Sequence, residues 1–92
     1  MDKRSSRLLL VEDDPQVASS LLRGLREEGF AVAAATRLAE ADRQLAQETP
    51  ALVILDLNLP DGDGRTWLRA VSQAAYRMPV IILTARATLL DR

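Results

Sequence analysis

The chain has 92 residues, of which 48% are hydrophobic and 27% charged, so we expect one globular domain with enough apolar material for a core. Its net charge of -1 gives no indication of nucleic acid or an anionic membrane as a partner, and the absence of cysteine and histidine excludes disulfides, thiolate or imidazole metal sites and histidine acid–base catalysis. No apolar run is long enough to cross a bilayer and no signal peptide is recognisable, so we expect a cytoplasmic protein with no membrane partner.

The first predicted strand covers residues 7–11, an apolar run that ends at a series of acidic residues and a proline. A short apolar run bounded by turn residues is typical of a strand buried on both faces. Pro15 suits the first position of a helix and Asp14 suits its N-cap. A helix is therefore predicted from residue 15 to about residue 28, where Gly29 terminates it.

The next strand–helix unit is less regular. Residues 30–35 follow a helix stop and are predicted to form a strand, although alanine has a low preference for strands. Thr36 is expected to cap a second helix over residues 37–48, whose apolar positions recur at helical spacing. Thr49 and Pro50 then break this helix before the following strand.

The central predicted strand covers residues 52–56, an apolar run that ends in the carboxylate of Asp56. A loop rich in proline, glycine and aspartate follows and leads into a third helix, about residues 64–75. Residues 79–84 form the clearest strand of the chain, with proline tolerated at its first position. Residues 85–92 are expected to form a loop and the beginning of another helix.

This alternation of strands and helices indicates an α/β fold with a doubly wound parallel sheet, about four strands and three helices, and helices on both faces. Because the last helix only begins at the end of the chain, we expect the sequence to stop short of a complete fold by a helix–strand–helix, about thirty residues. The domain is expected to cover residues 7–92, and residues 1–6 are expected to form a flexible N-terminal arm.

Acidic residues follow two of the predicted strands: Glu12 and Asp13 follow the first, and Asp56 ends the third. If these strands are parallel neighbours, their carboxyl ends meet at one edge of the sheet, where ligands bind in such folds. Clustered carboxylates repel one another, and Mg²⁺ completed by phosphate oxygens would relieve the repulsion. Asp56 could then react with a phosphoryl group. Thr84, at the end of the fourth strand, could donate to that group and respond to it.

Taken one at a time, the same residues also have ordinary structural roles as turn, cap or strand-end residues: Glu12, Asp13, Asp14, Asp56 and Thr84. Asp61 and Asp63 lie among glycines and are interpreted as turn or cap residues, because the spacing of a calcium-binding loop is absent. The functional interpretation depends on the conjunction of acids after two strands with a hydroxyl after a third.

Three segments of the chain resemble the receiver domain of bacterial two-component response regulators: residues 9–14 (LLVEDD), 55–64 (LDLNLPDGDG) and 80–86 (VIILTAR). The resemblance implies a flavodoxin/CheY-like fold with strand order 2-1-3-4. The motif DLNLPDGDG together with LTAR is similar to regulators with a winged-helix DNA-binding domain, the OmpR/PhoB type. Transcription would then be the output, and DNA would be bound only by an output domain absent from this chain.

The resemblance also implies a role for each site residue. Asp56 would accept a phosphoryl group from a sensor histidine kinase, in a self-catalysed transfer. Thr84 would be the switch hydroxyl, and the backbone N–H of Ala85 would contact the phosphoryl group. The ligands of Mg²⁺ would be Asp13 directly, Glu12 through water, Asp56, and the backbone carbonyl of Asn58.

One feature departs from the family pattern. The family has a lysine at the end of a fifth strand that pairs with the phosphoryl group, whereas the only lysine here is Lys3. We therefore expect a truncated receiver in which strand 80–83 forms an apolar edge of the sheet. A homodimeric or domain-swapped partner could cover that edge.

Two other functions compete with a phosphoaccepting switch. The first is a pseudo-receiver or truncated interaction module that binds partners without phosphorylation, which the truncation favours and the intact acids and Thr84 disfavour. The second is an aspartate-based phosphatase, but such enzymes typically place a second acid two residues after the nucleophile, where this chain has Asn58. The domain is thus expected to be a signalling module and not an enzyme.

Overall fold

The computed structural model describes residues 7–74 and 78–83. In this part of the chain the sheet strands are β1 (Arg7–Val11), β2 (Ala31–Ala35), β3 (Leu52–Asp56) and β6 (Val80–Leu83). All neighbouring pairs are parallel, and the order across the sheet is β2-β1-β3-β6. The predicted order of 2-1-3-4 is confirmed, because β6 is the fourth of these strands along the chain.

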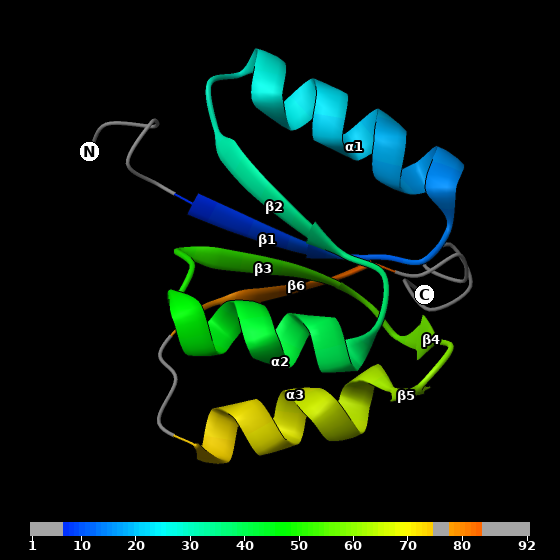
Figure 1. Ribbon diagram of the computed structural model, residues 1–92, viewed down its shortest axis with the longest axis vertical. Helices are drawn as coiled ribbons and strands as arrows, with labels where there is room; N and C mark the ends of the chain where they lie inside the picture. Colours follow the sequence, from blue (N-terminus) through cyan, green and yellow to red (C-terminus); the bar gives the residue numbers. More distant parts are fainter. Residues whose placement is uncertain (1–6, 75–77, 84–92) are drawn as a thin grey trace, which may run out of the picture.

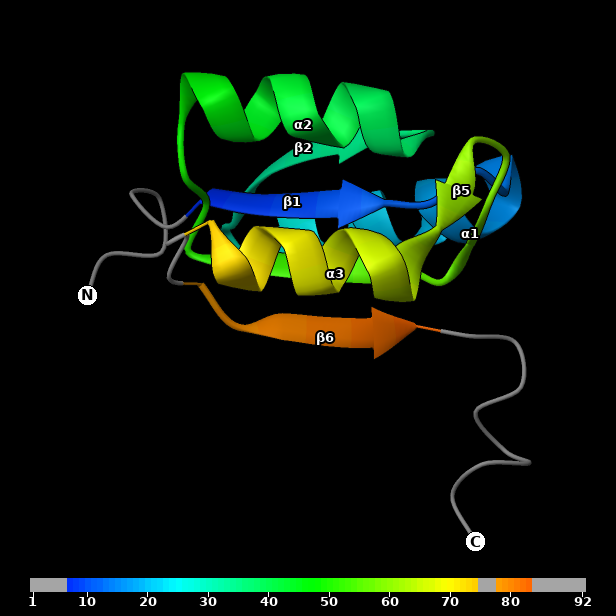
Figure 2. The same cartoon turned by 90° about the horizontal axis from the view of Figure 1, so that it is seen from below.

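The helices of the described part are α1 (Pro15–Glu27), α2 (Leu38–Gln47) and α3 (Gly64–Gln73). Helix α1 lies on one face of the sheet, and α2 and α3 lie side by side on the other, which is the predicted doubly wound arrangement (Figure 1). The strands run in one direction, as the arrows of β1 and β6 show in Figure 2, so their carboxyl ends meet at one edge of the sheet. None of the helices described here is both long and apolar enough to span a bilayer.

Both predicted ends of α1 are confirmed. The Asp14 carboxylate accepts the N–H of Gln16 at 2.9 Å and that of Val17 at 3.3 Å, and Pro15 occupies the first helical position. At the other end Gly29 has φ 99°, a left-handed conformation that glycine adopts without steric cost. A local sequence signal thus sets each end of this helix.

The prediction that Thr36 caps α2 is wrong. The helix begins at Leu38, and its N-cap residue, Arg37, makes no side-chain cap hydrogen bond. The cap comes instead from Asp61, whose Oδ1 accepts the N–H of Leu38 at 2.8 Å and whose Oδ2 accepts that of Ala39 at 3.0 Å. A residue distant in sequence therefore satisfies the first donors of this helix, and no local pattern could reveal that.

The loop after β3 contains a small antiparallel hairpin that was not predicted, formed by β4 (Asn58–Leu59) and β5 (Gly62–Asp63). Two-residue strands are too short to produce an alternating pattern in the sequence. The hairpin leads directly into α3, whose first turn is capped by Asp63, which accepts the N–H of Arg65 at 2.9 Å.

The core has one layer on each face of the sheet. The larger layer packs the sheet against α2 and α3, and its members are Leu9, Val11, Ala35, Leu38, Ala41, Leu45, Val53, Leu55, Leu59, Trp67 and Val71. The layer under α1 is built on Leu8, Leu10, Val32 and Ile54. The apolar positions predicted at helical spacing in α2 are buried, which confirms that prediction, and α3 buries Trp67 and Val71. Each fully buried aliphatic side chain contributes about 1.5–3 kcal/mol. Packing against both faces of the sheet therefore fixes the positions of the strands and of their ends.

Two predicted segments fall outside the described residues. They are the N-terminal arm of residues 1–6 and the helix expected to begin within residues 85–92.

Candidate metal and phosphoryl site

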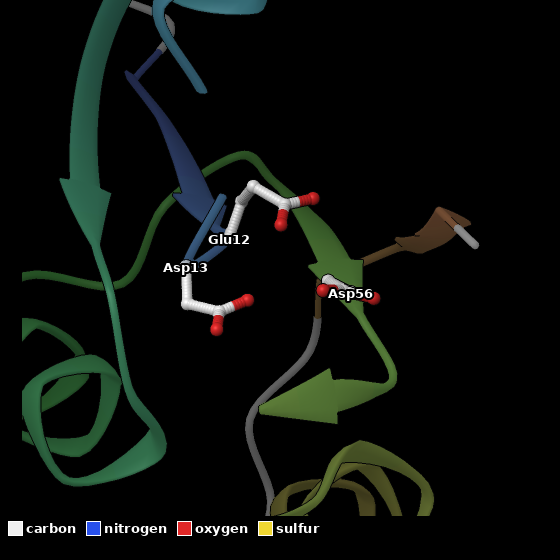
Figure 3. Close-up of side chains that lie close together, drawn as sticks. All are labelled: Glu12, Asp13 and Asp56. Carbon is white, nitrogen blue, oxygen red and sulfur yellow. The ribbon is translucent and has the colours of Figure 1, made fainter. Parts of the chain in front are cut away.

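Three carboxylates at the ends of two neighbouring strands come together at the carboxyl edge of the sheet (Figure 3). One oxygen from each of Glu12, Asp13 and Asp56 lies within 4.8 Å of the others. The register explains this meeting, because Val11 of β1 lies beside Leu55 of β3, and each is followed directly by an acidic residue.

Backbone hydrogen bonds fix two of these three residues. The N–H of Glu12 donates to the carbonyl of Ala35 at 2.9 Å and so extends the ladder between β1 and β2. The Glu12 carboxylate in turn accepts the N–H of Asp14 at 3.0 Å. Asp56 Oδ1 accepts the N–H of Asn58 at 3.2 Å. The Glu12 and Asp56 side chains are therefore oriented by the fold before any ligand binds.

Glu12 is buried, with 6% of its surface exposed, whereas Asp13 is exposed and Asp56 is half-buried. Burial raises the pKa of Glu12, and the negative charges of Asp56 and Asp13 raise it further. The hydrogen bond from the N–H of Asp14 lowers the pKa of Glu12 but does not cancel these effects. A cation bound among these carboxylates would relieve their mutual repulsion.

The acidic group opens into a cleft of about 360 Å³. Its lining residues are Glu12, Asp13, Asp14, Val17, Asp56, Asn58 and Leu83. Pockets of this volume accommodate small ligands. The donors are hard carboxylate oxygens, the chain has no cysteine or histidine, and this donor set suits Mg²⁺.

Asp14 lines the cleft but serves the fold in two ways. Its carboxylate caps α1, and its backbone N–H holds Glu12. The interpretation of Asp14 as a helix cap is therefore confirmed. Asp61 and Asp63 are likewise confirmed as caps, each for a different helix.

Gly64 supports the site in a way that the sequence analysis missed. A Cβ at this position would lie 2.9 Å from the Cα of Leu57 and 3.0 Å from the carbonyl oxygen of Asp56. The N–H of Gly64 also donates to the carbonyl of Leu57 at 3.0 Å. Only glycine lets the start of α3 approach the end of β3 this closely, and the glycine-rich loop was the one available signal.

The structure brings together some of the predicted site residues and leaves others untested. Glu12, Asp13 and Asp56 form the acidic group, and Asn58 lines the same cleft. Thr84 and Ala85 lie outside the described residues, so their proposed contacts to a phosphoryl group stay predictions.

Comparison with known proteins matches almost the whole chain. The family model described as "Response regulator receiver domain" matches residues 8–92. The transcriptional regulatory protein BasR of Escherichia coli (strain K12) is 41% identical over 86 residues, which make up 94% of this chain and 39% of BasR. The chain thus spans about two-fifths of the length of that relative.

Solved structures agree with this match. The chain is similar to the MaeR response regulator bound to beryllium trifluoride, with a TM-score of 0.82 and 33% identity over 87% of this chain and 67% of that one. It is also similar to the response regulator TrrA of Thermotoga maritima in complex with Mg²⁺-BeF, with a TM-score of 0.84 and 28% identity over 94% of this chain and 75% of that one.

Proposed function

The chain belongs to the response regulator receiver domain family, and on that premise we propose that Asp56 accepts a phosphoryl group from a sensor histidine kinase in the presence of Mg²⁺. The observation that carries the proposal is the convergence of the Glu12, Asp13 and Asp56 carboxylates within 4.8 Å at an open cleft. The domain would act as a signalling switch and not as an enzyme with turnover.

The transfer would use one oxygen of the Asp56 carboxylate as the nucleophile. The N–H of Asn58 holds Oδ1 of Asp56, which orients the carboxylate towards the cleft. An O–P bond forms to Asp56 while the N–P bond of the phosphohistidine breaks, and the histidine nitrogen keeps the electron pair and takes a proton from solvent.

The acidic residues around Asp56 would hold the cation. Mg²⁺ bound by Glu12, Asp13, Asp56 and the carbonyl of Asn58 would supply neutralisation of the negative charge on the phosphoryl oxygens. Because the pKa of Glu12 is raised, its ionised form is disfavoured in the metal-free site, and bound Mg²⁺ would favour that form. Support for the choice of metal comes from the hard oxygen donors and from the Mg²⁺ complex of the similar protein TrrA.

The consequence of phosphorylation would be transmitted to an output. We propose that Thr84 and the N–H of Ala85 contact the phosphoryl group and so favour one of two conformations. The similar protein BasR is a transcriptional regulatory protein, which supports transcription as the output. DNA would be bound by a segment other than the chain described here, and the complete regulator would work in the cytoplasm.

A second copy of the chain is proposed to cover the outer edge of β6. In the described sheet β6 is an edge strand, and two of its side chains are exposed, Ile81 at 52% and Ile82 at 40%. An exposed apolar edge strand favours pairing with another chain.

The test of phosphotransfer is the intact mass of the chain after incubation with acetyl phosphate and Mg²⁺. One phosphoryl adduct is expected on the native chain, with none on Asp56→Asn and none when EDTA removes the metal. An adduct on Asp56→Asn would show that a residue other than Asp56 accepts the phosphoryl group. Absence of an adduct from the native chain would favour the phosphorylation-independent interaction module instead.

A further inference from the structure

The two aspartates of the β4–β5 hairpin have different partners. Asp63 caps the helix that directly follows it, through the N–H of Arg65 at 2.9 Å. Asp61 instead reaches a helix that precedes it by more than twenty residues, and its two oxygens accept the N–H groups of Leu38 at 2.8 Å and Ala39 at 3.0 Å. One carboxylate therefore ties the hairpin to the start of α2.

This contact serves as the N-terminal cap of α2. Arg37 makes no cap hydrogen bond with its side chain, so Asp61 supplies the acceptors for the first two helical N–H groups. A negative charge at a helix N-terminus is favoured by the helix dipole. The hydrogen bonds from Leu38 and then Ala39 lower the pKa of Asp61, so the carboxylate stays ionised at neutral pH. The tie is therefore charge-assisted, although Asp61 itself is exposed.

The other end of the same hairpin touches the acceptor carboxylate. Asn58, the first residue of β4, donates its N–H to Asp56 Oδ1 at 3.2 Å and pairs across the hairpin with Asp63. Leu59 is buried in the core and pairs with Gly62. The segment between Asp56 and Asp61 is thus short, and the cross-strand pairs of the hairpin hold it together. A displacement of Asp61 would therefore also displace Asn58.

We propose that Asp61 is a positioning residue for the metal and phosphoryl site, because it clamps the hairpin to α2 and so holds Asn58 beside Asp56. The inference rests on the proposed function, in which the Asn58 carbonyl is a Mg²⁺ ligand. Without the clamp, the hairpin must be ordered when the metal binds, and the affinity for Mg²⁺ falls. Linkage is reciprocal, so Mg²⁺ in turn holds the hairpin against α2.

Calorimetric titration of the full chain with Mg²⁺ at neutral pH tests the clamp. The Kd for Mg²⁺ is expected to rise about tenfold in Asp61→Ala, the usual scale for a residue that orients a metal ligand. It should rise less in Asp61→Asn, which keeps one acceptor oxygen. Asp63→Ala is the matched control, because it also removes a helix cap from the hairpin, and its Kd should stay within about twofold of the native value.

Amide hydrogen exchange gives a direct view of the clamp. In the native chain, Mg²⁺ is expected to slow exchange of the N–H groups of Leu38 and Ala39, which lie on α2 and are not proposed metal ligands. The effect should disappear in Asp61→Ala. Exchange at these two amides that does not respond to Mg²⁺ in the native chain would overturn the clamp. Circular dichroism establishes that each variant is folded, and Asp61→Asn decides the question if the alanine variant is not.

A phosphorylation series over Mg²⁺ concentration separates positioning from loss of structure. Asp61→Ala should need more Mg²⁺ for half-maximal adduct formation yet reach the native rate at saturation. A native Mg²⁺ midpoint in both Asp61 variants, or an equal loss in Asp63→Ala, overturns the inference alone. A native chain that binds Mg²⁺ but takes up no phosphoryl group overturns the proposed function, while calorimetry still decides the clamp. A native chain that binds no Mg²⁺ overturns both.

Discussion

The carboxylate of Glu12 is buried. The same group is proposed to help bind Mg²⁺ and is expected to lower the stability of the metal-free domain. Burial raises the pKa of Glu12, with Asp56 and Asp13 adding to the effect. For an acid with a raised pKa, the stabilising contribution is present below the pKa of the unfolded chain and is lost as pH rises through the folded value. The ionised Glu12 therefore destabilises the metal-free domain at neutral pH.

We expect Glu12→Gln to unfold at a higher urea concentration than the native chain at pH 7 in EDTA. The difference should vanish near pH 4, where both side chains are neutral. Added Mg²⁺ should reverse the order, because the native chain gains more stability from a metal that it binds more tightly. Urea unfolding followed by circular dichroism at both pH values measures this. If Mg²⁺ raises the urea midpoint of the native chain less than it raises the midpoint of Glu12→Gln, Glu12 has no role at the site.

Gly64 is important because it has no side chain. In Gly64→Ala the added Cβ would meet two backbone atoms, the Cα of Leu57 at 2.9 Å and the carbonyl oxygen of Asp56 at 3.0 Å. Backbone cannot rotate away as a side chain can, so we expect a loss of about 1–3 kcal/mol in the free energy of unfolding. Adduct formation at Asp56 should also slow, because the end of β3 must move.

The chain offers a matched control for this substitution. A Cβ at Gly24 of α1 would meet no atom within 4 Å. Gly24→Ala should therefore stabilise the domain by about 0.5–1 kcal/mol, as expected for an exposed helix interior. Urea unfolding of both variants measures the two opposite signs. Equal behaviour of the two alanine variants would contradict the close approach at Gly64.

At the scale of whole elements, Asp14 allows a role in capping a helix to be distinguished from a role as a metal ligand. Its carboxylate caps α1, but the group that holds Glu12 is its backbone N–H, which survives substitution. We expect Asp14→Ala to cost about 1 kcal/mol of folding free energy, the usual effect of losing an N-cap. The Kd for Mg²⁺ should stay close to the native value. A large loss of Mg²⁺ affinity in calorimetry, with α1 intact, would make Asp14 a ligand.

The elements also show why some features could be predicted from the sequence and others could not. The strands were recognisable as short apolar runs, and α1 had Asp14, Pro15 and Gly29 as local signals at its ends. The cap of α2 could not be found in this way, because Asp61 lies 23 residues from Leu38. A hydrogen bond between residues far apart in the chain produces no periodic pattern in the sequence.

The same distinction applies to the site. The meeting of Glu12 and Asp56 followed from two strands that end in acid and lie side by side in a parallel sheet. Gly64 could not be identified, because its importance comes from a contact with backbone atoms of β3 that only three-dimensional structure reveals. Sequence reasoning thus located the acidic residues but not the packing and hydrogen bonds that hold them.

At the scale of the whole molecule, the outer edge of β6 is the surface that we propose a second copy of the chain covers. Ile81 and Ile82 point to opposite faces of the sheet, since they lie beside Ile54 and Leu55, which belong to the two different core layers. Both are substantially exposed, so neither layer is closed over β6 in the described part of the chain. Apolar surface on both faces of one edge strand favours self-association.

We therefore expect the apparent mass of the native chain in sedimentation equilibrium to increase with protein concentration. Ile81→Lys should keep the chain monomeric over the same range, because a charged side chain on an edge strand blocks pairing. Ala46→Lys, at an exposed position of α2, makes the same change of charge away from the edge and should associate like the native chain. If the native chain stays monomeric throughout, or if both lysine variants lose association equally, the β6 edge is not the interface. In the second case net charge, and not the apolar edge, would govern how these chains meet.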